Sequence, residues 1–124
     1  MQARDGNQFL PPECLPPSGV VVMVDGTPAA ASFVYLPNAA IAYIAFTCVN
    51  PGVPGRVRLD AARRAIEGVV DIAERFLGGR GFIEMPTHQH SLHRIALDLG
   101  FADGGPVRTA FLVIGDGIDP DMLT

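Results

Sequence analysis

The sequence has few cysteines, little positive charge and no long hydrophobic run. Cys14 and Cys48 lack the short spacing of a zinc site and are too few for a disulfide framework, which fits a reduced, intracellular setting. The net charge of −4 disfavours general attraction to nucleic acid or to an anionic membrane, because such binding needs clustered Lys and Arg. No run approaches the roughly 20 apolar residues that span a bilayer, and the N-terminus lacks the apolar core of a signal peptide. We therefore expect a cytoplasmic protein.

The chain has 124 residues, of which 48% are hydrophobic, and this is enough to fill one core. Residues 1–18 contain four prolines, which remove backbone donors and favour extended conformations, so they predict an irregular arm. Residues 19–114 are predicted to form the domain, and residues 115–124 a polar tail. The expected organisation is one domain with an extension at each end.

The first half of the domain reads as three strands. Residues 19–24 and 27–36 flank Asp25-Gly26, a pair that supplies the positive φ angles of a tight hairpin. Residues 39–49 form a nearly continuous apolar run, typical of a strand covered on both faces, and Asn50-Pro51-Gly52 ends it.

The second half alternates helices and strands. Apolar residues recur at three- and four-residue steps over 59–77, which predicts a long amphipathic helix ended by Gly78-Gly79. Residues 81–85 read as a short buried strand, residues 92–99 as a second helix that ends at Gly100, and residues 108–114 as a last strand. The predicted fold class is α/β, in the order β-β-β-α-β-α-β.

This order resembles the GCN5-related N-acetyltransferase (GNAT) superfamily from its second strand to its sixth. Two local motifs strengthen the resemblance: Val49-Asn50-Pro51 looks like the family's Val-x-Pro, and Leu99-Gly100-Phe101 looks like the Leu-Gly-Phe that closes its last helix. The resemblance implies a mixed sheet that lacks the first strand and the two front helices of the family. The open sheet edge that results predicts a homodimer, a protein partner or coverage by the Pro-rich arm.

The resemblance also implies an acetyl-CoA site at the end of the third strand, with the pyrophosphate held by backbone N–H groups at a helix N-terminus. Pro54, Val57 and Leu59 stand where the family has Arg or Gln and two glycines, so the loop departs from the pattern. Arg56 and Arg58 either compensate through bidentate phosphate contacts or are ordinary surface arginines, as Arg63 and Arg64 are expected to be. The expected cofactor-binding residues are Phe46, Cys48, Val49, Gly52, Gly55, Arg56, Val57 and Arg58.

Many family members use a tyrosine to protonate the departing thiolate, and Ala96 stands in its place here. The candidate catalytic residues are instead His88, Glu84 and Tyr43, since imidazole and carboxylate groups serve as bases and a tyrosine hydroxyl can donate a hydrogen bond. His88, His90 and His93 lack a nearby carboxylate or Cys ligand pattern, so no metal is expected.

Two functions fit this pattern. One is an acetyl-CoA-dependent N-acetyltransferase that acts on an unidentified amine. The alternative is a non-catalytic GNAT-like binding module in a protein assembly, such as a phage-related complex. A nucleic-acid partner fits less well, because the arginines lack interleaved aromatic residues and the overall charge is negative.

Overall fold

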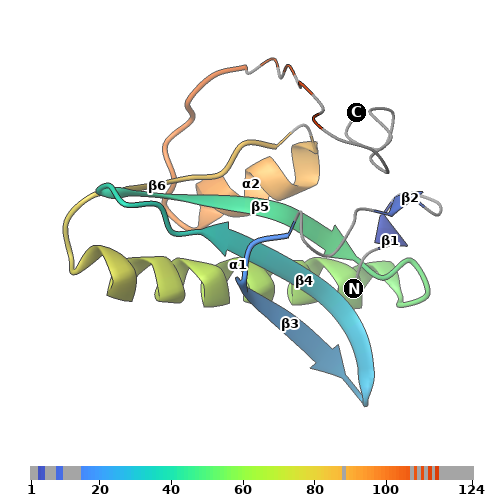
Figure 1. The fold of residues 1–124 in the computed structure, drawn as a ribbon. Helices are drawn as coiled ribbons and strands as arrows, with labels where there is room; N and C mark the ends of the chain where they lie inside the picture. Colours follow the sequence, from blue (N-terminus) through green and yellow to red (C-terminus); the bar gives the residue numbers. More distant parts are fainter. Residues whose placement is uncertain are drawn as a thin grey trace.

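The computed structural model describes residues 3–4, 8–9, 15–87 and 89–106, together with 108, 110, 112 and 114. Near the N-terminus, β1 (Ala3–Arg4) and β2 (Gln8–Phe9) form a small antiparallel pair within the segment predicted to be irregular. The main sheet has four strands in the order β3-β4-β5-β6 (Figure 1). They are β3 (Ser18–Val24), β4 (Thr27–Tyr35), β5 (Ile41–Val49) and β6 (Phe82–Glu84).

The first three strands form the predicted antiparallel meander, and β6 runs parallel to β5. Asp25 and Gly26 turn the first hairpin with φ angles of 49° and 79°, as their sequence predicts. The parallel pairing of β5 and β6 requires a crossover, which the long helix between them provides. The mixed α/β fold class is therefore confirmed.

Two helices complete the fold: α1 (Gly55–Leu77) and α2 (His90–Asp98). Helix α1 runs beneath the sheet and contacts all four strands (Figure 1). It ends at Leu77 as predicted, with Gly78 in the left-handed conformation. Its start was predicted wrongly at residue 59, because the polar first turn from Gly55 onward carries no apolar periodicity.

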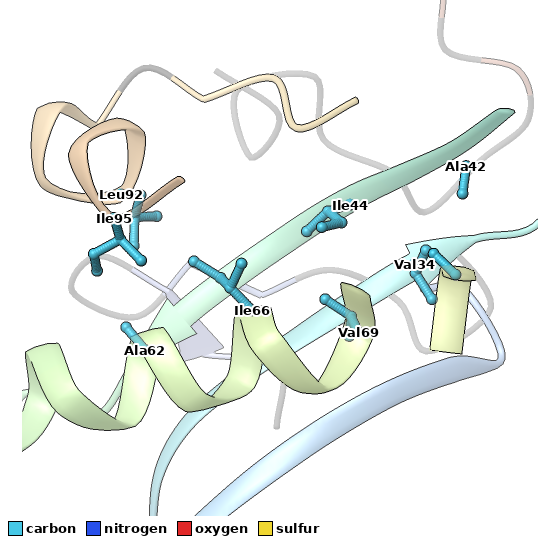
Figure 2. Packing of buried hydrophobic residues seen from close by; sticks show 9 residues of the cluster. Val34, Ala42, Ile44, Ala62, Ile66, Val69, Leu92 and Ile95 are labelled. Atoms are coloured by element: carbon cyan, nitrogen blue, oxygen red, sulfur yellow. The ribbon is translucent and has the colours of Figure 1, made fainter. Parts of the chain in front are cut away.

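The core lies between α1, α2 and one face of the sheet. Ile66 of α1 lies between Ile44 of β5 and Ile95 of α2 (Figure 2). The buried residues of this cluster are Val34, Ala42, Ile44, Ala62, Ile66, Val69, Ala73, Leu92 and Ile95. At Gly68, α1 approaches β3 so closely that an added Cβ would lie 2.9 Å from a methyl group of Val20. Small residues on α1 thus set how near the helix lies to the strands.

A β-bulge interrupts the pairing of β4 with β5. Ala31 lies opposite Cys48, whereas Phe33 lies opposite Ala45, so β5 has one residue more than β4 between these pairs. Beside the bulge, the hydroxyl groups of Ser32 and Thr47 form a hydrogen bond of 2.8 Å, and both side chains are buried. This pair ties the bulged part of β5 to β4.

We expect Ser32→Ala to lower the free energy of unfolding by about 1–3 kcal/mol, because it leaves the buried Thr47 hydroxyl without its partner. The double variant Ser32→Ala/Thr47→Val removes both hydroxyls, so it should cost less than the sum of the single variants. Urea denaturation of the four proteins measures this coupling. Additive effects would show that the two hydroxyls do not stabilise each other.

The last two predicted strands differ from expectation. The segment 81–85 is not buried: Phe82 is 67% exposed and Glu84 is also exposed, because β6 lies at the edge of the described sheet. The strand predicted at 108–114 is not observed among its described residues, which are Arg108, Ala110, Leu112 and Ile114. The described sheet therefore ends at β6.

Candidate functional site

The C-terminal half of β5 contains the bulge. Phe46 has a φ of 55°, which is unusual for a bulky residue and marks local backbone strain. Its ring packs edge-on against Tyr35, with the ring centroids 6.3 Å apart. Cys48 is half-buried on β5. Val49 packs against the core cluster and against a second buried group, which consists of Ala29, Ala30, Ala61 and Ala65. Bulges of this kind often re-aim the backbone next to a functional site.

Strands β5 and β6 are paired over only three residues. Ile41, Ala42 and Tyr43 pair with Phe82, Ile83 and Glu84, and β6 then ends. The remaining part of β5, from Ile44 to Val49, continues without β6 beside it. The bulge therefore lies in the part of β5 that β6 leaves uncovered.

The loop between β5 and α1 is held by Asn50. Its side-chain amide donates to the Pro28 carbonyl at 2.8 Å, and its Oδ1 accepts the N–H of Gly52 at 2.9 Å. The Asn50 carbonyl also accepts the N–H of Val53 at 3.2 Å. The N–H groups of Gly52 and Val53 therefore already have acceptors within the loop.

Free donors lie instead at the N-terminus of α1. The N-cap is Pro54, which has no N–H and makes no side-chain cap, and the first internal bond runs from the Arg58 N–H to the Pro54 carbonyl at 2.9 Å. The N–H groups of Gly55, Arg56 and Val57 therefore have no acceptor within the helix. No acidic residue lies in the first turn, so the helix dipole there favours an anion.

Arg56 and Arg58 add positive charge to this helix end. Arg56 is exposed and Arg58 is half-buried, and neither has a carboxylate partner among the residues that the structure describes. Two turns further on, Arg63 pairs with Glu67 and Arg64 with Asp60. The first two arginines are therefore available to an anion, whereas the second two are neutralised on the helix surface.

The first turn fits a phosphate group without a glycine-rich loop. Val57 is half-buried and Leu59 is exposed, and both lie inside α1 rather than in the loop before it. An added Cβ at Gly55 would meet only the Arg58 guanidinium, at 3.5 Å, so the approach to the first N–H is open. The donors, the charge and the open approach together make this helix end suited to a phosphate-type anion.

Two of the candidate catalytic residues lie side by side. Tyr43 of β5 and Glu84 of β6 are directly paired in the parallel register, so their side chains share one face of the sheet. Ala42 and Ile44 pack toward α1, so this face is the one that points away from the helix. Tyr43 is half-buried and Glu84 exposed. His88, the third candidate, lies outside the described residues.

The other two histidines lie on α2. His90 is exposed, and His93 Nε2 lies 3.5 Å from Asp103 Oδ1. Among the described residues, no group of three or more His, Cys, Asp or Glu side chains is arranged to hold a metal ion. The His93–Asp103 pair was not anticipated, because the two residues are brought together only by the turn after α2.

Ala96 and the motif after it have a structural role. Ala96 is buried, and its carbonyl accepts the N–H of Phe101 at 3.0 Å, while Gly100 with φ 102° donates to Leu97 at 3.1 Å. These two bonds form a Schellman motif, which explains why the helix ends in Leu-Gly-Phe.

Asn50-Pro51-Gly52 was predicted only to end the strand before it. An Asn before Pro-Gly is also the sequence signal for the side-chain turn that the structure shows, in which Asn50 Oδ1 accepts the Gly52 N–H.

In the part of the chain that the structure describes, no helix is long and apolar enough to cross a membrane.

No protein-family model and no curated protein matches the sequence. A solved structure described as "Putative acetyltransferase from Agrobacterium tumefaciens str. C58" is similar, with a TM-score of 0.51 and 19% sequence identity. The matched region covers 77% of this chain and 66% of that protein. At this identity the likeness shows the fold alone.

Proposed function

We propose that this acetyltransferase-like fold binds acetyl-CoA and transfers the acetyl group to an amine. The observation that carries the proposal is the N-terminus of α1, where three N–H groups without a helical acceptor meet two arginines that have no carboxylate partner among the described residues. This anion site directly follows the bulged strand β5. The structural likeness to an acetyltransferase supports the same assignment.

Different residues at this end of the fold would bind different parts of the cofactor. The N–H groups of Gly55, Arg56 and Val57 would hold the pyrophosphate, with the guanidinium groups of Arg56 and Arg58 on its oxygens. The backbone from Phe46 to Val49 would lie beside the thioester. Acetyl-CoA supplies an acyl carbon on a thiol leaving group, so transfer forms a C–N bond, breaks a C–S bond and releases one proton from the amine.

Glu84 and Tyr43 are the residues that would contact the amine substrate. A carboxylate beside the amine accepts its proton, and the adjacent Tyr43 hydroxyl can orient the nitrogen by a hydrogen bond. His88 remains the alternative base. No residue is assigned to protonate the thiolate, because Ala96 is buried and carries no acidic proton.

The alternative function is a non-catalytic module that binds another protein. The observations that favour it are Ala96 at the position of the family's acid, and Val57 and Leu59 of α1 at the positions of the family's two glycines. In this case the fold is retained as a scaffold and the helix end is an ordinary surface.

Binding of acetyl-CoA separates the two functions. At 100 times its dissociation constant, a ligand that binds only the folded state adds about 2.7 kcal/mol of stability, which raises the melting temperature by several degrees. We expect millimolar acetyl-CoA to produce such a shift in the wild-type protein. Arg56→Ala/Arg58→Ala should lose most of it, because both phosphate contacts are removed.

The matched control is Arg63→Ala/Arg64→Ala, which removes the same charge from the same helix but from arginines already paired with carboxylates. Its shift with acetyl-CoA should stay close to that of the wild type. No shift in any of the proteins would reject cofactor binding and favour the non-catalytic module. An equal loss in both double variants would assign the effect to overall charge rather than to this site.

A further inference from the structure

Two tyrosines and a glutamate form one row across the main sheet. Tyr35 of β4 pairs with Tyr43 of β5, and Tyr43 pairs with Glu84 of β6. Residues that are directly paired lie on the same face of a sheet. This cross-strand row therefore spans three neighbouring strands, and its two ends are about 10 Å apart. Its three side chains are close enough together to contact one small ligand.

The cross-strand row lies on the face of the sheet that points away from α1. Val34 and Ile44 belong to the core between the sheet and the helix (Figure 2). Because successive residues of a strand point to opposite faces, Tyr35 and Tyr43 point away from this core. Tyr35 is 40% exposed, Tyr43 is half-buried and Glu84 is exposed. A ligand can therefore reach the row from solvent.

The charge of the row is unusual for this sheet. Glu84 is the only charged residue in the four strands β3–β6. It forms no ion pair with an Arg or His of the part of the chain that the structure describes. The face of a tyrosine ring attracts a cation, and its apolar carbons pack against an aliphatic chain. A lone carboxylate in one row with two tyrosines is thus complementary to a cation on an apolar stem.

The row also lies next to the bulged part of β5, which the proposed function places beside the thioester. The ring of Tyr35 packs edge-on against the ring of Phe46, with 6.3 Å between the two centroids. Phe46 is the residue of the bulge whose φ is 55°. If acetyl-CoA binds as proposed, a group held by the row is therefore near its acyl carbon.

We propose that the cross-strand row selects the acceptor amine, and that the acceptor is a primary alkylammonium group on an aliphatic stem. Glu84 pairs with the ammonium, and the two tyrosine rings contact its charge and its stem. Tyr35 is then a specificity-determining residue, because it takes no part in the proton transfer assigned to Glu84. The inference rests on the proposed acetyl transfer, since without that reaction the ammonium is a ligand and not a substrate.

Two small amides test this selection in the full chain without a cofactor. Nα-acetyl-lysine methylamide has an ammonium on an aliphatic stem, and Nα-acetyl-norleucine methylamide has the same stem without the charge. The sequence contains no Lys, so no ammonium side chain of the protein competes with the probe. In a titration followed by the NMR shifts of the backbone N–H groups, we expect the lysine amide to perturb Tyr43 and Glu84. It should bind about 5-fold or more tightly than the norleucine amide.

Substitutions in the row should change this preference. Glu84→Gln should bind the two amides about equally, because the charge that distinguishes them has lost its partner. Tyr35→Leu should weaken the lysine amide about 2- to 5-fold, the effect of one exposed cation–π contact, and leave the norleucine amide unchanged. The matched control is Glu74→Gln, which removes an exposed carboxylate from α1, on the other side of the sheet. It should bind both amides as the wild type does.

The melting temperature of the same proteins with acetyl-CoA separates this inference from the proposed function. A wild type that acetyl-CoA stabilises but that binds both amides equally would overturn the selection and leave the transfer standing. A lysine preference that Glu84→Gln abolishes, without any stabilisation by acetyl-CoA, would reject the transfer and keep the row as an ammonium site. Equal losses in Glu84→Gln and Glu74→Gln, or NMR shifts confined to another face, would overturn the row.

Discussion

Ile66→Ala is expected to lower the free energy of unfolding by about 2–5 kcal/mol. Ile66 is fully buried on α1 and packs between the sheet and α2 (Figure 2). The shortened side chain removes apolar surface from the core and leaves a cavity between three elements, and such a site relaxes only partly. Thermal and urea unfolding measure the loss, which should lower the melting temperature by on the order of 10 °C.

Leu59→Ala is the matched control, because it shortens an aliphatic side chain of the same helix that is half exposed. Its cost should stay below about 1 kcal/mol, since little buried surface is lost. If Ile66→Ala and Leu59→Ala destabilised the protein equally, α1 would not pack on the sheet through the face described.

Gly81→Ala is expected to destabilise the protein by about 3 kcal/mol or more. Gly81 has a φ of 139°, a conformation that strains any residue with a side chain. An added Cβ would also lie 2.5 Å from the Ala40 carbonyl oxygen, which is backbone and cannot rotate away. That same oxygen accepts the Phe82 N–H at 3.2 Å, so relief of the collision breaks the bond that begins the β5–β6 pairing.

Gly79→Ala separates strain from collision. Gly79 has a φ of 86°, but an added Cβ would meet no atom within 4 Å, so only the conformational cost of about 1–2 kcal/mol applies. Unfolding of the two variants, with hydrogen exchange of the β6 amides, measures the difference. Equal destabilisation would mean that the approach of Gly81 to Ala40 does not hold β6 in place.

The candidate site was only partly predictable from the sequence. The sequence pattern located the loop after β5 and the two arginines that follow it, Arg56 and Arg58, because a helix N-terminus after an Asn-Pro-Gly break is a local feature. It did not place the free N–H groups, since a helix start at Gly55 rather than at residue 59 depends on the polar first turn. The pairing of Tyr43 with Glu84 depends on strand register, which links residues 41 positions apart.

The sequence by itself determined the local elements: the hairpin at Asp25-Gly26, the meander, the amphipathic face of α1 and the glycine ends of both helices. Each is encoded by neighbouring residues through turn chemistry, side-chain period or positive φ. Only the tertiary structure decided that Phe82 and Glu84 are exposed, that β5 bulges at Phe46 and that the Asn50 amide donates to the Pro28 carbonyl. Whether a short apolar strand is buried depends on which neighbours cover its edge and faces, and those neighbours lie far away in the sequence.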